Sequence, residues 1–420
     1  MKRRYSLLII FSLLFFFITS TTWAELSTAK PEDVGLSSER LNRLGGSLKA
    51  HIEKGVMPGS VAMVVRKGKI AYFESFGMRD LETNSPMQKD TIFKIYSMTK
   101  PIISVGIMIL QEQSRIFLRD PVSKFIPEFK EMKVGVESTD SGTGEKAFTE
   151  VPAEREITIQ DLLRHTSGLT YSFFGNSKVN MMYKEAGLGS QDRTLAEMVI
   201  KLSQLPLASQ PGTRWEYSRS TDVLGRVIEI VSGMTLDKYF EERIFKPLQM
   251  NDTGFYVKPE KIERVAKSGP QAKWPSSYAT STPKLLSGGG GLVSTAHDYM
   301  RFMQMFINGG ELEGVRLLGK NTVEYMTSDH LGSIPKKGPG YFPGTGHGFG
   351  LGFSVREVPG VAPLPGSVGD LSWAGIGGTN FFINPSEDLC AVYMVSANDF
   401  GLMFYYFTLF RTLVMQAIVD

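Results

Sequence analysis

The sequence has 420 residues, of which 42% are hydrophobic, and a formal net charge of +3 at pH 7. This length is ample for one large or two medium globular domains with an extensive core. The small net charge does not point to a nucleic acid or a membrane surface as a partner. The only cysteine, Cys390, lies in an apolar segment and is expected to be a small core residue, so the fold must be held together without a disulfide.

The first 24 residues have the pattern of a secretory signal peptide. Three cations, Lys2, Arg3 and Arg4, precede an apolar stretch at residues 7–18, and the segment ends at Ala24. An N-terminal membrane anchor, the alternative, needs about 18 or more apolar residues, and this stretch is shorter. No cysteine follows it, so a lipid anchor is not expected. We therefore expect cleavage near Ala24, a mature chain without formal net charge, and a periplasmic or secreted protein.

The first strands and the first long helix are predicted from the pattern of apolar residues. Residues 60–66 and 69–77 are rich in β-branched and aromatic side chains and are predicted to form a hairpin. A short strand at 92–95 leads into a segment from residue 101 that is apolar on every side, which indicates a buried helix. Between residues 115 and 285 the periodicity is mostly helical, at 157–166, 194–205, 221–233 and 235–245.

The C-terminal part returns to strands. A glycine run at 288–291 precedes an amphipathic helix, and an apolar helix at 404–418 ends the chain. Because Arg411 lies in the middle of that last helix, we expect it to cover a sheet and not to span a bilayer. Between these helices, strands are predicted at 347–357, 370–376, 378–385 and 389–397.

Strands at both ends of the chain without strict βαβ alternation predict an α/β (α+β) fold with a mainly antiparallel sheet flanked by helices. We expect residues 25–114 and 286–420 to form this sheet lobe and residues 115–285 to form an inserted helical lobe. The two lobes together are expected to form one catalytic unit.

A serine and a lysine three residues apart open the apolar helix. On a helix Ser97 and Lys100 share a face, and both burial and the positive end of the helix dipole favour a neutral lysine amine, which can act as a base for the serine. The alternative is a helix-capping serine beside a lysine that extends to the surface. The same spacing also occurs, without a preceding strand or a following buried helix, at Ser27–Lys30, Ser281–Lys284 and Ser333–Lys336.

Several motifs together resemble the serine β-lactamase and penicillin-binding-protein superfamily, with most similarity to class C β-lactamases and family VIII carboxylesterases. They are SMTKP at 97–101, LLRHTSGL at 162–169, PGTRWEYS at 211–218, GGGGLVSTAHDYMRF at 288–302, GFGLGF at 348–353 and WAGIGGTNFFINP at 373–385. The resemblance extends over nearly the whole mature chain. It implies a β-lactamase/transpeptidase-like fold, acyl transfer through an acyl-enzyme, and no cofactor.

The resemblance also implies the roles of individual residues. Ser97 would be the acylated nucleophile and Lys100 its base, and Tyr217 would exchange a proton with the nucleophile and the leaving group. For that exchange the sequence suggests a phenolate at Tyr217, favoured by Lys100. The backbone N–H groups of Ser97 and Ile376 would form the oxyanion hole. Without these roles, Tyr217 would be a loop aromatic packed beside Trp215.

Two departures from the β-lactamase pattern favour an ester over a lactam. Arg219 stands where an asparagine usually holds an amide substrate, so its role is open. By resemblance to the carboxylesterases, Trp373-Ala-Gly375 replaces the motif that usually begins with lysine, and an apolar wall would suit a neutral acyl ester. Gly375 would let the substrate approach the strand, whereas Trp373 could be an ordinary core aromatic. The letters Lys267-Ser268-Gly269 also match that motif, but they lie in a segment without strand character.

Other hydrolytic sites find little support in the sequence. There is no G-x-S-x-G motif for a Ser-His-Asp triad, and His165 is expected to be structural. No pair of histidines has the spacing of a zinc site. We therefore predict an exported serine hydrolase for a small-molecule ester or amide. It would be a carboxylesterase for short acyl esters, with weak β-lactamase activity as a possible addition. A penicillin-binding sensor and a D-amino-acid peptidase on the same fold are the alternatives.

Overall fold

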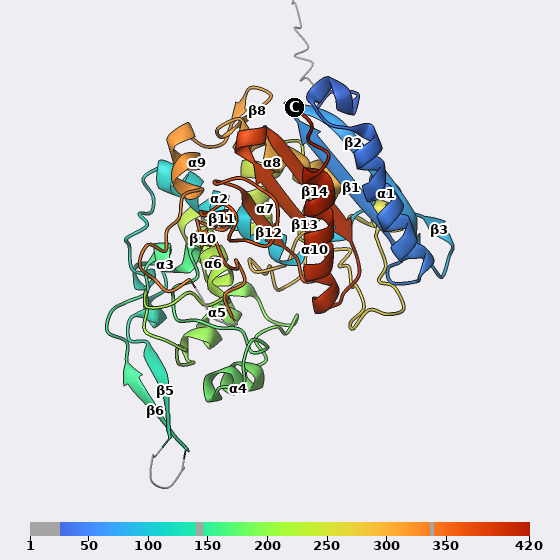
Figure 1. The fold of residues 1–420 in the computed structure, drawn as a ribbon. Helices are drawn as coiled ribbons and strands as arrows, with labels where there is room; N and C mark the ends of the chain where they lie inside the picture. Colours follow the sequence, from blue (N-terminus) through green and yellow to red (C-terminus); the bar gives the residue numbers. More distant parts are fainter. Residues whose placement is uncertain (1–25, 140–145, 337–339) are drawn as a thin grey trace, which may run out of the picture.

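A computed structural model describes residues 26–139, 146–336 and 340–420. The predicted signal peptide lies outside the described residues. An eight-stranded antiparallel sheet runs in the order β10-β11-β12-β13-β14-β1-β2-β3 (Figure 1). Its strands are β1 (Gly59–Arg66), β2 (Lys69–Asp80), β3 (Ser85–Pro86), β10 (His347–Phe349), β11 (Ser354–Arg356), β12 (Leu371–Ala374), β13 (Asn380–Asn384) and β14 (Leu389–Val395).

Helices cover both faces of this sheet. Helices α1 (Ser38–Glu53) and α10 (Phe400–Met415) pack on one face, and α2 (Thr99–Glu112) and α8 (Ala296–Ile307) lie on the other (Figure 1). Every residue of β1 is buried, because successive side chains point into the two cores in turn. The predicted mainly antiparallel sheet flanked by helices is confirmed.

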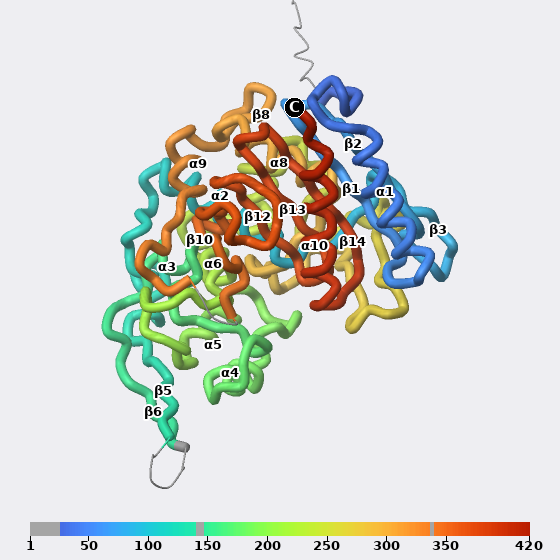
Figure 2. The backbone as a smooth tube through the Cα atoms, viewed as in Figure 1, coloured from blue at the N-terminus to red at the C-terminus, as the bar shows by residue number. Residues whose placement is uncertain are grey.

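Both ends of the chain contribute to the same layers. Strand β1 pairs with β14, and Val61 lies opposite Met394. Helices α1 and α10 also pack together, so the blue N-terminal part and the red C-terminal part run side by side (Figure 2). The sheet lobe is thus assembled from segments that are more than three hundred residues apart, such as β1 and β14.

The middle of the chain is mostly helical but also contains a hairpin that sequence reasoning missed. Strands β5 (Lys133–Thr139) and β6 (Lys146–Pro152) extend away from the body of the molecule (Figure 1). Most residues of β5 are exposed, so the hairpin lacks the apolar alternation that identifies a half-buried strand. The helices here are α3 (Ile159–Leu163), α4 (Lys178–Glu185), α5 (Leu195–Ser203), α6 (Ser220–Ser232) and α7 (Leu236–Phe240), which continues as a π-helical turn at Glu241–Phe245.

Two strand predictions were wrong in extent. The predicted strand 347–357 is a hairpin of β10 and β11, because the chain turns at Gly350–Phe353, where Gly352 has a φ of +100°. The predicted strand 92–95 is reduced to β4 (Phe93–Lys94), which pairs with β7 (Val293–Ser294) outside the main sheet. The remaining elements are β8 (Glu311–Leu312), β9 (Val315–Arg316) and α9 (Lys320–Met326).

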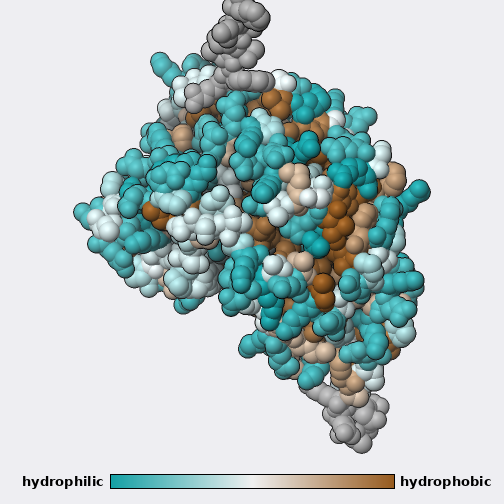
Figure 3. All heavy atoms as spheres, turned by 180° about the vertical axis from the view of Figure 1, so that it is seen from behind, coloured by the Kyte–Doolittle hydropathy of each residue, from teal (hydrophilic) through white to brown (hydrophobic). Residues whose placement is uncertain are grey.

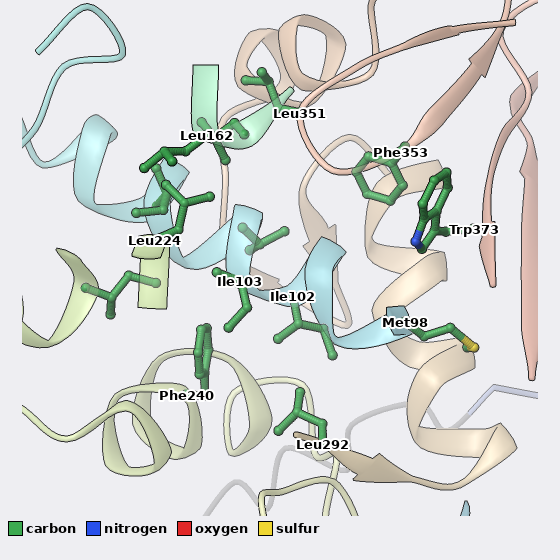
Figure 4. Close-up of a cluster of buried hydrophobic side chains, with 14 of the residues drawn as sticks. Met98, Ile102, Ile103, Leu162, Leu224, Phe240, Leu292, Leu351, Phe353 and Trp373 are labelled. Carbon is green, nitrogen blue, oxygen red and sulfur yellow. The ribbon is translucent and has the colours of Figure 1, made fainter. Parts of the chain in front are cut away.

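Helix α2 lies in the centre of the larger core. Figure 4 shows Ile102 and Ile103 of α2 between Leu224 and Phe240 of the helical region and Phe353 near the sheet. All of these side chains belong to one buried cluster. Because this core is continuous, the division into lobes at residues 115 and 285 stays a prediction.

The surface and the last helix bear on the membrane question. Seen from behind, hydrophilic residues cover most of the surface, and hydrophobic residues come to it in a band right of centre (Figure 3). Helix α10 packs Phe410 and Val414 into the smaller core, as expected for a helix that covers a sheet. Among the described residues, no helix is long and apolar enough to cross a membrane.

Candidate active site

The turn before α2 brings Ser97 to the start of the helix. A 3₁₀ turn at Tyr96–Met98 runs directly into α2, and Tyr96 has a φ of +46°, a strained value for a tyrosine. The N-cap is Met98, so Ser97 is not the capping residue that the alternative interpretation required. Pro101 falls in the first turn of α2, where its missing N–H would have had no partner within the helix.

Lys100 is enclosed by protein. Its side chain is buried, and Nζ donates hydrogen bonds to Ser97 Oγ at 3.2 Å and to the Gly289 carbonyl at 2.6 Å. Burial is the main cause that lowers the pKa of this amine; the charge of Asp222 opposes the shift, the cation of Arg219 adds to it, and the resulting pKa is about 7. Lys100 therefore does not extend to the surface. Near neutral pH a large fraction of its amines is uncharged and able to accept the Ser97 proton.

Tyr217 stands beside both groups. The Lys100 Nζ lies 4.5 Å from the centroid of its ring, and Trp373 Nε1 donates a hydrogen bond to its hydroxyl at 3.2 Å. Burial raises the pKa of Tyr217, and hydrogen bonding with Ser97 and Trp373 only partly offsets this rise. The phenolate predicted for Tyr217 from the sequence is therefore wrong, because burial holds the phenol in its neutral form. In this form Tyr217 can donate a proton, which leaves Lys100 as the base.

The segment after β12 forms the opposite wall of the site. Trp373 is nearly buried, and its ring packs edge-on to Phe349, so it is both a core aromatic and a hydrogen-bond partner of Tyr217. A Cβ on Gly375 would lie 2.4 Å from the Ile95 carbonyl oxygen. Gly375 thus permits a close approach of the chain's own backbone, and its role toward a substrate stays a prediction. Ile376 lines the cavity together with Ser97, and its oxyanion role stays a prediction.

A buried carboxylate that sequence reasoning missed connects Arg219 to Lys100. Arg219 forms an ion pair with Asp222 at 3.3 Å. The other oxygen of Asp222 accepts hydrogen bonds from Ser287 Oγ at 2.7 Å and from the Gly289 N–H at 2.9 Å. The same Gly289 offers its carbonyl to Lys100. Asp222 follows the WEYS motif by four residues, and this position is the signal that could have identified it.

We expect Asp222→Asn to shift the pH dependence of the reaction. Loss of the carboxylate removes the charge that raises the pKa of Lys100 and leaves the Arg219 cation, which lowers it, uncompensated. Since Lys100 must be neutral to accept a proton, the rise of kcat/KM with pH should move to lower pH in this variant. A pH profile of ester hydrolysis measures the shift. Asp298→Asn changes a buried carboxyl outside the cavity and should leave the profile in place. A shift to higher pH in Asp222→Asn would contradict the network.

Ser97 lies in a cavity of about 1140 Å³ between the helical region and the sheet. Its wall is rich in aromatic side chains from both parts, including Tyr171, Phe174, Tyr217, Phe342, Trp373 and Phe404. Two other segments that match a motif only in their letters do not form such a site. Lys284 lines the cavity but Ser281 does not, and Lys267-Ser268-Gly269 lies in a loop that does not line it.

His165 supports the wall behind Tyr217. Its ring is buried 4.9 Å from that of Tyr217, and its Nδ1 lies 3.2 Å from Ser218 Oγ. Burial, together with the nearby charge of Lys100, lowers the pKa of His165 and keeps the imidazole neutral. Its backbone carbonyl accepts a hydrogen bond from the Glu216 N–H at 2.8 Å. The contacts of this histidine thus fix the segment that carries Tyr217.

Comparisons with known proteins place this geometry in a family. The family model Beta-lactamase matches residues 46–404. The chain is 35% identical over 371 residues to an uncharacterized protein of Mycobacterium tuberculosis, covering 83% of this chain and 88% of the relative. It is 28% identical over 372 residues to esterase EstB of Burkholderia gladioli, covering 82% and 87%. It is 26% identical over 379 residues to lovastatin esterase of Penicillium rubens, covering 84% and 92%.

Comparison with solved structures finds the same fold. The structure of EstCE1, a hydrolase with promiscuous acyltransferase activity, matches with a TM-score of 0.73 and 27% identity, covering 90% of this chain and 98% of that one. Simvastatin synthase of Aspergillus terreus, at 23% identity and a TM-score of 0.72, shares the fold and covers 90% and 99%. With a serine and a buried lysine in contact at the start of α2, this chain is a serine hydrolase that belongs to the Beta-lactamase family.

Proposed function

We propose that this serine hydrolase is a carboxylesterase that cleaves short acyl esters through an acyl-enzyme at Ser97. The observation that carries the proposal is the contact between Ser97 Oγ and the buried Lys100 amine, whose pKa is lowered to about 7. This contact supplies a base near neutral pH. Esterases among the relatives support the same chemistry.

The reaction follows from the positions of three side chains. Neutral Lys100 takes the Ser97 proton while Oγ forms a bond to the ester carbonyl carbon. The backbone N–H groups of Ser97 and Ile376 stabilise the oxyanion. The bond from carbon to the alcohol oxygen then breaks, Tyr217 gives its proton to that oxygen, and the Lys100 ammonium returns a proton to Tyr217. Water attacks the acyl-enzyme by the same route and releases the carboxylic acid and free Ser97.

An ester is favoured over a β-lactam by the wall opposite Ser97. Trp373 offers an apolar surface and a donor already engaged with Tyr217, so it gives no positive charge to a substrate carboxylate. Arg219 is paired with Asp222 and so is partly neutralised. We therefore propose β-lactam hydrolysis only as a weak side activity. A penicillin-binding sensor and a D-amino-acid peptidase are the competing functions.

Mass spectrometry of the purified chain separates these functions. Brief exposure to a short-chain aryl ester should give rapid turnover without a lasting adduct. A stable adduct with a β-lactam and no ester turnover would indicate a sensor instead. Release of D-alanine from a D-alanyl-D-alanine peptide faster than ester cleavage would indicate a peptidase. Absence of any reaction would contradict all three functions.

Export is the second part of the proposal and rests on the sequence of residues 1–24. Cleavage near Ala24 would deliver the enzyme to the periplasm or the medium. N-terminal sequencing of the protein from that compartment should begin at or near Glu25. An intact Met1 on an active protein that remains in the cytoplasm would contradict export.

We expect Trp373→Phe to lower kcat for ester hydrolysis about 3- to 10-fold. The variant keeps an aromatic wall but loses the indole N–H that binds Tyr217, and one such hydrogen bond contributes about 1 kcal/mol. Trp215→Phe is the matched control, because its ring stacks on Tyr217 while its indole N–H has no partner among the described residues. Steady-state kinetics with one short ester give kcat for both variants and the wild type. Equal effects of the two substitutions would contradict a role for the Trp373 hydrogen bond.

A further inference from the structure

Four phenylalanines that line the cavity pack together as a cluster. We call Phe174, Phe342, Phe400 and Phe404 the aromatic cluster. Ring centroids lie 4.7 Å apart for Phe174 and Phe342, and 5.1 Å apart for Phe400 and Phe404. Phe342 joins the two pairs, at 6.2 Å from Phe400 and 6.4 Å from Phe404. Three separate segments of the chain thus converge on one aromatic surface, and all four residues line the cavity.

The aromatic cluster remains open to solvent. Phe400 is 37% exposed and Phe404 is 42% exposed, although both line a cavity large enough to hold a substrate. Their neighbours Met403 and Phe407 line the same cavity, so α10 presents an apolar stripe to it at helical spacing. Large apolar side chains kept exposed around a cavity mark a place where an apolar ligand is bound.

Tyr217 fixes which half of the ester meets the aromatic cluster. The centroids of Phe342 and Phe174 lie 5.7 Å and 5.8 Å from that of Tyr217. A general acid must be within hydrogen-bond reach of the oxygen that it protonates. In the proposed reaction that oxygen belongs to the departing alcohol. The alcohol half of the substrate therefore lies beside Tyr217 and against the aromatic cluster.

Charged side chains also line the cavity, namely Lys94, Arg219, Asp222 and Lys284. Arg219 is paired with Asp222, and its guanidinium lies over the ring of Tyr171. The aromatic cluster itself offers only π faces and edges, which bind flat apolar rings by offset stacking or edge-to-face contact.

We infer that the leaving alcohol of the natural ester carries a bulky, flat, apolar group, aromatic or polycyclic, that binds in the aromatic cluster. This inference rests on the proposed esterase function. Cleavage releases that alcohol with the proton from Tyr217 and leaves the acyl group on Ser97. The aromatic cluster selects the alcohol, and the acyl group can stay short.

Three esters of primary aliphatic alcohols test the inference. 2-(2-Naphthyl)ethyl acetate carries the ring on the alcohol, ethyl 3-(2-naphthyl)propanoate carries it on the acyl half, and ethyl acetate lacks it. We expect kcat/KM of the wild-type enzyme to be about 10-fold or more higher for the first ester than for either of the others. Preference for the ring on the acyl half, or no preference for a ring, would overturn the inference while hydrolysis itself upholds the esterase. No cleavage of any ester and no acyl adduct would overturn the proposed function as well.

Variants locate the binding surface. In Phe404→Ala and Phe342→Ala, the ratio of kcat/KM for naphthylethyl acetate to that for ethyl acetate should fall about 10-fold. Phe117→Ala is the matched control, since Phe117 is 47% exposed and lies outside the cavity, and the ratio should not change. An unchanged ratio in both cavity variants would overturn the assignment of the alcohol to the aromatic cluster.

Discussion

Replacing Lys100 by methionine is expected to lower the rate of Ser97 acylation by a factor of about 10³ or more. Methionine fills a similar volume but cannot take the serine proton, and a positioned general base contributes about 10² to 10⁴ to a rate. Single-turnover kinetics with a short-chain ester measure the loss. Lys320→Met, which removes an exposed lysine, should leave the rate unchanged. Acylation at more than about a tenth of the wild-type rate in Lys100→Met would contradict the assignment of the base.

The same substitution is expected to stabilise the fold. In the folded protein the pKa of Lys100 is lowered from 10.5 to about 7, so the unfolded chain binds more protons between these pH values. Wild-type stability must therefore rise as pH increases through this window, and at pH 7 burial of the amine costs folding free energy. Each pKa unit corresponds to about 1.4 kcal/mol. After allowing for the lost bond to Gly289, we expect Lys100→Met to gain roughly 2 to 4 kcal/mol at pH 7.

Denaturant unfolding at several pH values tests this second effect. The difference in free energy of unfolding between Lys100→Met and the wild type should shrink from pH 7 to pH 10, as the wild-type penalty disappears. A variant less stable than the wild type at pH 7 would show that Lys100 is bound as a well-compensated ammonium. A group other than Lys100 would then have to accept the Ser97 proton.

Ser97→Ala should abolish ester hydrolysis, with a loss of about 10⁴-fold or more in kcat, because no nucleophile remains. The fold should be unaffected, since Ser97 does not cap α2 and the substitution removes only the hydrogen bonds with Lys100 and Tyr217. Ser104→Ala is a matched control on the same helix: this serine is buried and its hydroxyl has no partner among the described residues. Its activity should stay close to that of the wild type. Substantial turnover by Ser97→Ala would mean that another group is acylated.

The sequence was sufficient where the chemistry is local. Ser97 and Lys100 are three residues apart where a 3₁₀ turn runs into a helix that is apolar on every side. Spacing and periodicity therefore favoured their contact and the burial of the amine, while the alternative of a capping serine stayed open until the structure placed both side chains. The sheet was predictable for a similar reason, because the strands near the C-terminus are short apolar runs between turn residues.

Contacts between distant residues could not be predicted in this way. The bond from Trp373 to Tyr217 joins residues 156 positions apart, and the carboxylate of Asp222 reaches Gly289 across 67 positions. The neutral state of Tyr217 depends on how completely the fold buries it, which the spacing of residues does not reveal. The packing of Gly375 against the Ile95 backbone could not be predicted either, because these residues are far apart in the sequence.

The most direct test of the acyl-enzyme is to find the acyl group on the protein. The wild-type enzyme is mixed with a short-chain ester, quenched with acid within milliseconds, digested, and analysed by peptide mass spectrometry. We predict one added acyl mass, located on Ser97 and absent from both Ser97→Ala and Lys100→Met. An acyl mass on any other residue, or burst-phase release of alcohol by Ser97→Ala, would contradict the assignment of Ser97 as the nucleophile.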